Sequence, residues 1–266
     1  MTGSADLHEH REGTALKVWL SVVNVAAQGP ARRGVMIAVA AVALGSLAFA
    51  ADAVDGVTAQ FVVTALVSSG LAWGLAAFVA GLTATGRRGA VAGATALLVS
   101  ATLVYYLLVL LVSRRWSGGY LADGSSADGY GLRSVAVMTT GWLLVSMVAG
   151  PVLGLLGRMT RTARVPIAAL AAGAACGLLS GQGWQQVAMA PPWRVWLIGS
   201  PDADYVRGLL ALQLLGVVVP LAGLAWVATR RRLWQDWPTL FIAMAGTATL
   251  SALFWHVLPV VVIWLH

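Results

Sequence analysis

Residues 165–183 read VPIAALAAGAACGLLSGQG, a run of 19 residues without a charged side chain. An α-helix rises 1.5 Å per residue, so about 20 apolar residues cross the hydrocarbon core of a bilayer. Glycine recurs every fourth residue in this run, at Gly173, Gly177 and Gly181, which places three glycines on one helix face. Because small residues let membrane helices approach closely, we expect this run to be a transmembrane helix that packs on another helix through its glycines.

Six further apolar runs of similar length predict an all-α fold, a polytopic transmembrane bundle of about seven helices. The composition agrees, because 59% of the 266 residues are hydrophobic and only 10% are charged. A soluble domain typically carries about 25% charged residues, and a soluble chain this apolar could not cover its surface. The predicted spans are 34–51, 57–81, 90–112, 134–157, 165–183, 207–229 and 238–265.

The arginines alternate between the two sets of loops, which predicts an orientation. One set of loops carries twice as many arginines as the other, and cytoplasmic loops are the ones that carry an excess of basic residues. We therefore expect a cytoplasmic N-terminus and an extracytoplasmic C-terminus, in a bacterial cell (inner) membrane. The net charge of +7 does not indicate nucleic-acid binding, which would need a continuous basic face. The ten arginines of the cytoplasmic set are Arg32, Arg33, Arg87, Arg88, Arg158, Arg161, Arg164, Arg230, Arg231 and Arg232, and the five of the other set are Arg114, Arg115, Arg133, Arg194 and Arg207.

The regions outside the spans differ in polarity. Residues 1–13 are polar and predicted to be disordered, whereas 14–33 form an amphipathic segment expected to lie in the membrane interface. Residues 34–266 form a single transmembrane domain with two long external loops, 113–133 and 184–206. The first span also fits a twin-arginine signal, since Arg32-Arg33 precede an apolar run that ends in Ala48-Phe49-Ala50. The polytopic remainder favours retention of this span as a helix.

Motifs of familiar membrane chemistry are missing. The sequence contains no Walker motif, no HExxH, no G-x-S-x-G and no aspartate-rich motif for a diphosphate with magnesium. The one cysteine, Cys176, lies in an apolar run and excludes an intramolecular disulfide or a cysteine metal site. No acidic or basic residue lies deep in a predicted span, where many pumps carry one. We expect no metal and no cofactor, and the sequence leaves open whether the protein is an enzyme.

Aromatic and amide side chains gather near the predicted extracytoplasmic ends of three spans. They suggest an outward-facing aromatic cavity that binds a small amphiphilic or hydrophobic ligand. The alternative is structural: tyrosine and tryptophan form an interfacial belt, and the glutamines hydrogen-bond between helices. The candidate ligand-binding residues are Tyr105, Tyr106, Gln182, Trp184, Gln185, Gln186 and Gln213.

Three residues near the same membrane face are the candidates for catalysis. His256 lies in the outer part of the last span, and Asp52 and Asp55 follow the first span. We consider the hypothesis that His256 pairs with one of these carboxylates across the outer surface. The alternative is that His256 is an ordinary histidine whose hydrogen bonds are satisfied within the bundle.

Short glycine and aromatic motifs over roughly 65–180 resemble a known family. They are Ser69-Gly70-x-x-Trp73, Ala77-Phe78-x-x-Gly81, Gly89-Ala90-x-Ala92-Gly93, Tyr105-Tyr106 and Gly150-Pro151-Val152-x-Gly154-x-x-Gly157. The pattern is similar to that of a family of small actinobacterial multi-pass membrane proteins whose function is not established. The resemblance implies class and topology only. It also implies an acidic residue after the glycines of the fifth span, where this chain has Gln182 and Gln185-Gln186.

Two functions from different classes stay open. The first is a permease-like or immunity-like membrane component that binds a small hydrophobic ligand besides the membrane lipids. The second is an integral membrane enzyme acting on a lipid or isoprenoid, such as a membrane-bound terpene cyclase, which would need an acid to protonate its substrate. The sequence also allows a subunit of a larger complex and does not reveal the oligomeric state.

Overall fold

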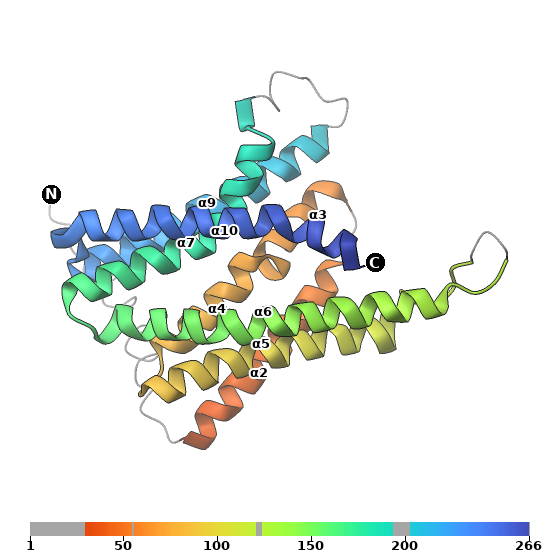
Figure 1. Cartoon of the computed structure of the whole chain (residues 1–266), viewed down its shortest axis with the longest axis horizontal. Coiled ribbons are helices and arrows are strands. Elements are labelled where there is room, and N and C mark those ends of the chain that lie inside the picture. The colour runs from red at the N-terminus through yellow and green to blue at the C-terminus, as the bar shows by residue number, and fades with distance from the viewer. Residues whose placement is uncertain (1–29, 55, 121–123, 194–202, 266) are drawn as a thin grey trace, which may run out of the picture.

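The described part of this computed structural model, residues 30–54, 56–120, 124–193 and 203–265, is helical and contains no strand (Figure 1). Seven of its helices are long and apolar enough to cross a membrane, as the sequence predicts. Residues 1–13 and most of the predicted interfacial segment lie outside this part of the chain. The elements are α2 (Pro30–Ala51), α3 (Val57–Val63), η1 (Thr64–Ser68), α4 (Gly70–Leu82), α5 (Arg87–Leu108), η2 (Val109–Ser113), α6 (Asp128–Thr162), α7 (Val165–Met189), α9 (Ala203–Arg231), η3 (Leu233–Asp236) and α10 (Trp237–Leu265).

Two helices extend further than the sequence predicts. α6 begins at Asp128, inside the expected loop 113–133, where the Asp128 carboxylate accepts a hydrogen bond from the Gly118 N–H at 3.0 Å. α7 continues to Met189, inside the expected loop 184–206. The reason is the buried Gln213 of α9, whose Nε2 donates to the carbonyl oxygens of Gln186 (3.2 Å) and Ala190 (2.8 Å). The bond to Ala190 satisfies a carbonyl group just beyond the helix end, and the bond to Gln186 adds to the one that its carbonyl oxygen already accepts from the Ala190 N–H.

The second span is broken, although the sequence predicts one continuous helix over 57–81. α3 passes into the π-helical turn η1, and the backbone at Ser69 is then extended, with φ −80° and ψ 158°, before α4 begins at Gly70. The Ser69 side chain accepts a hydrogen bond from the Ala72 N–H and thereby caps α4. Ser-Ser-Gly at 68–70 is a helix-start signal, which a hydropathy average over the span hides.

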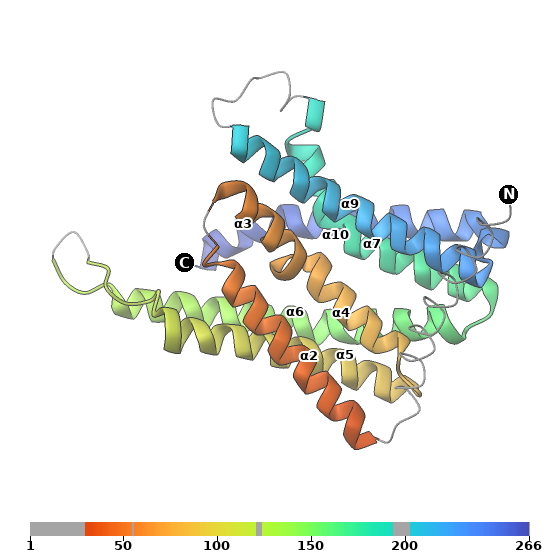
Figure 2. The same cartoon turned by 180° about the vertical axis from the view of Figure 1, so that it is seen from behind.

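α7 is the central helix. In the apolar part of this span 67% of the residues are buried, against 11–29% in the other six spans. Its principal partner is α10, and the two helices lie side by side in both views (Figures 1 and 2). An added Cβ would overlap Leu240 at Gly173, Met244 and Thr247 at Gly177, and Ser251 at Gly181. The prediction that the glycine stripe faces another helix is therefore confirmed.

The remaining helices form two groups around α7. α9 packs on α7, where Gly183 meets Gly216. On the other side α4, α5 and α6 pack together, since Gly154 of α6 lies against the backbone of Ala90 in α5 and of Gly81 in α4. α2 crosses α5 diagonally (Figure 2).

Arginine side chains close one end of the bundle, which we call the arginine end. Arg33 donates to the carbonyl oxygens of Ala80 (3.4 Å) and Gly89 (3.2 Å), and Arg161 donates to that of Ala84 at 2.5 Å. These hydrogen bonds satisfy carbonyl groups near the end of α4 and the start of α5. They also join α2, α4, α5 and α6. The opposite end contains Asp52 and is called the Asp52 end.

Candidate functional site

A cavity of about 700 Å³ lies among α4, α5, α6, α7 and α10, a volume typical of sites for small organic ligands. Apolar side chains form most of its wall, and Ala48 of α2 closes one side. Side chains with a polar or aromatic group also line it: Ser68, Ser69, Trp73, Thr102, Tyr105, Tyr106, Trp142, Ser146, Ser251, Phe254 and Trp255. Of the predicted ligand-binding residues, the structure places Tyr105 and Tyr106 in this cavity.

Several hydroxyl groups in the wall are already hydrogen-bonded. The Thr102 hydroxyl donates to the Leu98 carbonyl oxygen at 2.9 Å and lies 3.3 Å from the hydroxyl oxygen of Ser146. Ser251 donates to the Leu178 carbonyl oxygen at 2.9 Å. The contacts of Thr102 with Ser146 and of Ser251 with Leu178 join neighbouring helices, so these hydroxyl groups have a structural role.

The break in the second span forms part of the cavity wall. The Gly70 N–H donates to Oε1 of Gln182 at 3.1 Å, and the Trp73 indole N–H donates to the Val67 carbonyl oxygen at 3.0 Å. Non-helical backbone at membrane depth is tolerated where it is buried in protein or lines a cavity, and here it does both. Gln182 is therefore a residue that stabilises the break.

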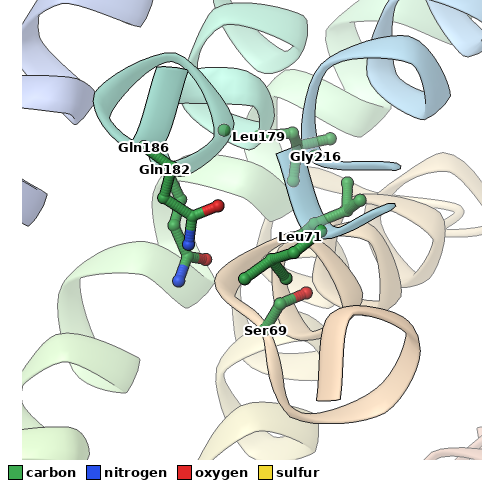
Figure 3. Close-up of a pocket in the computed structure, with 8 residues that line it drawn as sticks. Ser69, Leu71, Leu179, Gln182, Gln186 and Gly216 are labelled. Carbon is green, nitrogen blue, oxygen red and sulfur yellow. The ribbon is translucent and has the colours of Figure 1, made fainter. Parts of the chain in front are cut away.

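A second, much smaller pocket lies beside this break (Figure 3). Gln182 and Gln186 project from α7 toward Ser69 and Leu71 at the start of α4. Its volume is about 10 Å³, close to the minimum that one water molecule needs. Gln182 and Gln186 thus line one pocket, but its space is too small for an organic ligand.

The other predicted ligand-binding residues lie outside both pockets. Trp184 is 43% exposed on α7, and Gln185 is half-buried. Gln213 is buried and supports the end of α7, although its Oε1 has no partner among the described residues. The structural interpretation of Gln213 as a hydrogen bond between helices is the one that its contacts support.

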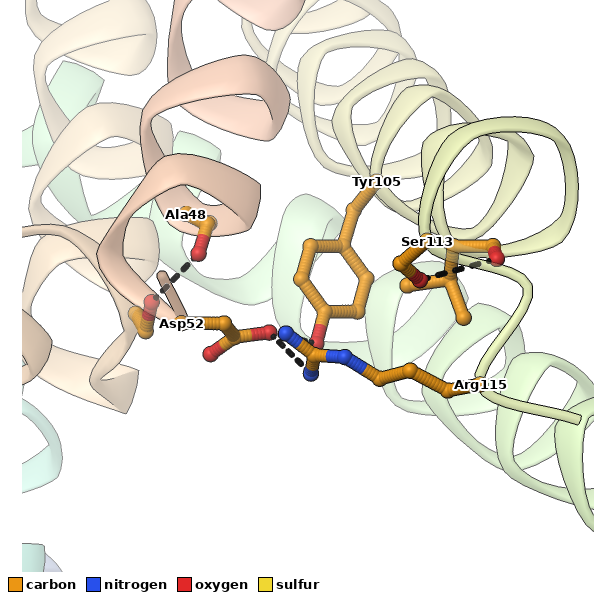
Figure 4. A network of polar contacts seen from close by, with 7 residues as sticks. Ala48, Asp52, Tyr105, Ser113 and Arg115 are labelled. Atoms are coloured by element: carbon orange, nitrogen blue, oxygen red, sulfur yellow. Dashed lines mark hydrogen bonds and ion pairs between the residues drawn. The ribbon is translucent and has the colours of Figure 1, made fainter. Parts of the chain in front are cut away.

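Asp52 and Tyr105 form a polar cluster with Arg115 at one edge of the cavity (Figure 4). The Tyr105 hydroxyl donates to Oδ2 of Asp52 at 2.8 Å, and Arg115 Nη1 contacts the same oxygen at 3.0 Å. Asp52, one of the two carboxylates considered as partners of His256, is therefore paired with Arg115, while His256 is exposed on α10. Asp55 lies outside the described residues.

The polar and aromatic lining residues that the sequence did not predict are Ser68, Ser69, Trp73, Thr102, Trp142, Ser146, Ser251, Phe254 and Trp255. Nothing in the neighbouring sequence indicates that these residues line a cavity. Only Ser68 and Ser69 belong to a recognisable local motif, the helix-start signal at 68–70. Among the residues that the structure describes, no three His, Cys, Asp or Glu side chains form a group that would hold a metal ion.

Comparisons with protein-family models, with curated proteins and with solved structures find no match to this chain. The resemblance to the actinobacterial membrane family therefore stays a prediction, and the function has to be inferred from the cavity itself.

Proposed function

We propose that this chain is a permease-like or immunity-like integral membrane protein that binds a small hydrophobic or amphiphilic ligand in the cavity at the Asp52 end. The observation that carries the proposal is the cavity of about 700 Å³, whose wall draws residues from five transmembrane spans besides Ala48 of α2. The apolar wall and the aromatic rings of Trp73, Trp142 and Trp255 suit a hydrocarbon chain or ring.

The broken second span supports a transport-related role. In many transporters a discontinuous helix forms part of the binding site near the bilayer midplane. Here the break at Ser69 and Gly70 borders the cavity, and the π-helical turn η1 immediately precedes it. Such turns are frequent at functional sites.

The alternative, an enzyme acting on a lipid or isoprenoid, receives less support. Aromatic walls would stabilise carbocations, as a terpene cyclase requires. A proton donor is also required, and none of the described residues that line the cavity is Asp, Glu or His. The carboxylate nearest the cavity, Asp52, already accepts hydrogen bonds from Tyr105 and Arg115.

The arginine distribution supports an orientation within a bacterial cell (inner) membrane. Arg33, Arg158, Arg161 and Arg231 all hydrogen-bond carbonyl groups at the arginine end. By the positive-inside rule this end faces the cytoplasm, so the cavity opens near the extracytoplasmic side. Reporter fusions after residues 88 and 120 should report opposite compartments, and the same compartment for both would overturn this orientation.

Ligand binding can be tested with three photoreactive C18 chains that carry a mid-chain diazirine and end in a carboxylate, a methyl ester or an ammonium group. The full chain in phosphatidylcholine nanodiscs is irradiated with each probe, and labelled peptides are mapped by mass spectrometry. We expect saturable labelling of peptides that line the cavity by at least one probe.

A cavity-filling variant and a matched control make this test specific. Val145→Phe places a larger side chain at a half-buried cavity position, whereas Val39→Phe makes the same change on the exposed surface of α2. We expect Val145→Phe to abolish saturable labelling and Val39→Phe to leave it unchanged. Uniform, non-saturable labelling by all three probes would overturn the proposed function.

A further inference from the structure

The cavity borders the outer surface of the bundle between α6 and α10. Leu144 and Val148 of α6 and Leu250 of α10 line it, yet their exposed fractions are 64%, 68% and 65%. α10 packs along α7, while α6 packs along α4 and α5, so the two helices belong to different groups. They run along the same face of the molecule (Figure 1). In a bilayer this opening faces hydrocarbon, so a ligand can enter from the membrane.

An aromatic pair spans this opening. The rings of Trp142 in α6 and Trp255 in α10 have centroids 6.1 Å apart, and both residues line the cavity. Phe254 stacks edge-on against Trp255 at 5.6 Å. The pair is the aromatic contact between α6 and α10 among the described residues, and both tryptophans line the cavity.

Three hydrogen-bond donors at the cavity have no partner. The Tyr106 hydroxyl and the indole N–H groups of Trp142 and Trp255 make no hydrogen bond with any residue that the structure describes. Other aromatic donors of the same chain are satisfied: Trp73 donates to Val67, and Tyr105 donates to Asp52. Hydrocarbon offers no acceptor, so donors at membrane depth favour a ligand that supplies one.

The charge of the cavity restricts the ligand further. None of the described residues that line it is Asp, Glu, His, Lys or Arg. The charged side chains at the cavity edge, Asp52 and Arg115, are paired with each other, so a carboxylate or ammonium group deeper inside would lack a counter-ion at a large desolvation cost. The free indole groups donate only, so they recognise an acceptor such as an ester, ketone or ether oxygen.

We propose that the ligand is an uncharged long-chain amphiphile whose polar end accepts hydrogen bonds, and that Tyr106, Trp142 and Trp255 bind this end. The inference rests on the proposed function and names the chemical class of its ligand. The ligand enters from the bilayer between α6 and α10, and its apolar part packs against the side chains of Leu98, Leu153 and their neighbours in the cavity wall.

The three diazirine probes distinguish this inference from the proposed function. We expect the methyl ester to label cavity peptides at a concentration at least about fivefold lower than the carboxylate or ammonium probe, because a charged head group pays a desolvation cost that the ester does not. Equal labelling by the three head groups, or preference for a charged one, would overturn the inference while leaving ligand binding intact. Failure of every probe to label the cavity would overturn both.

Tyr106→Phe tests the donor directly, with Tyr130→Phe as a matched control because Tyr130 is 66% exposed and does not line the cavity. The competitors are methyl oleate and the hydrocarbon 1-octadecene, each measured against labelling by the methyl ester probe. In the wild type methyl oleate should compete better than the hydrocarbon. Tyr106→Phe should reduce this preference by about fivefold, since one hydrogen bond is lost, and Tyr130→Phe should keep it. An unchanged preference in Tyr106→Phe would remove Tyr106 from head-group recognition.

Discussion

Replacing Gly177 with leucine should separate α7 from α10, because this glycine lies where the two helices are in close contact. A Cβ at this position would lie 2.7 Å from the Ala248 amide nitrogen and would overlap Thr247 Oγ1 and the Met244 carbonyl oxygen. Overlap with backbone cannot be relieved by a change of rotamer, so the helices themselves must shift.

The magnitude follows from two contributions. Overpacking of a tight contact costs typically about 1–3 kcal/mol. A shift also weakens the hydrogen bond of Thr247 to the Ala174 carbonyl oxygen and that of Ser251 to the Leu178 carbonyl oxygen, at 3.0 and 2.9 Å. Each interhelical bond contributes on average about 0.6 kcal/mol in a membrane protein, which gives roughly 2–4 kcal/mol in all. The unfolding equilibrium constant should therefore rise by roughly 30- to 700-fold.

The single cysteine provides the assay. Cys176 is buried in α7, so the rate at which a thiol-reactive maleimide dye labels it in detergent reports the opening of this helix. Gly246→Leu is the matched control, because Gly246 lies in α10 and an added Cβ there meets nothing within 4 Å. Circular dichroism on SDS titration should show the same order of stability. If Gly177→Leu and Gly246→Leu unfold alike, the close contact between α7 and α10 does not exist.

Substitutions at four further positions test the cavity edge. Gln182→Leu leaves the Gly70 N–H unpaired and should cost about 1–3 kcal/mol in the same SDS titration, and a variant as stable as the wild type would contradict this role of Gln182. Ser69→Ala removes the cap of α4 and should cost about 1 kcal/mol, and a variant as stable as the wild type would contradict its capping role. Asp52→Asn and Arg115→Ala should each change stability by less than about 1 kcal/mol, because the pair is partly exposed. Their effects should not add in the double variant, and additive effects would show that the ion pair does not form.

The break in the second span was not predicted from the sequence, which indicated one continuous helix. Hydropathy over 57–81 indicates one span, and the structure does place one span there, Thr58–Leu82. The break at Ser69 depends on Gln182, which lies 112 residues further along the chain and accepts the hydrogen bond of the first α4 amide. A local helix-start signal was present, but whether a membrane helix breaks there depends on a partner that a single segment does not show.

For the candidate site too, some residues could be predicted from the sequence and others could not. Tyr105 and Tyr106 were predicted from their position near one end of a span, and both line the cavity. Trp142 and Trp255 were not predicted, because each is one of 12 tryptophans and nothing in its own segment distinguishes it. The glutamines were conspicuous in an apolar chain, but the contacts of Gln182 and Gln213 are with backbone groups of neighbouring helices.

By itself the sequence determined which segments are long and apolar enough to cross a membrane and on which loops the arginines lie. These properties follow from adding per-residue values within one segment, because the free energy of placing a residue in hydrocarbon is set largely by that residue. The tertiary structure alone decided that α6 and α10 border a cavity and that Trp142 meets Trp255. Such contacts depend on the rotation and crossing angle of each helix, which are fixed by close packing at sites such as Gly177 and Gly154 and not by hydropathy.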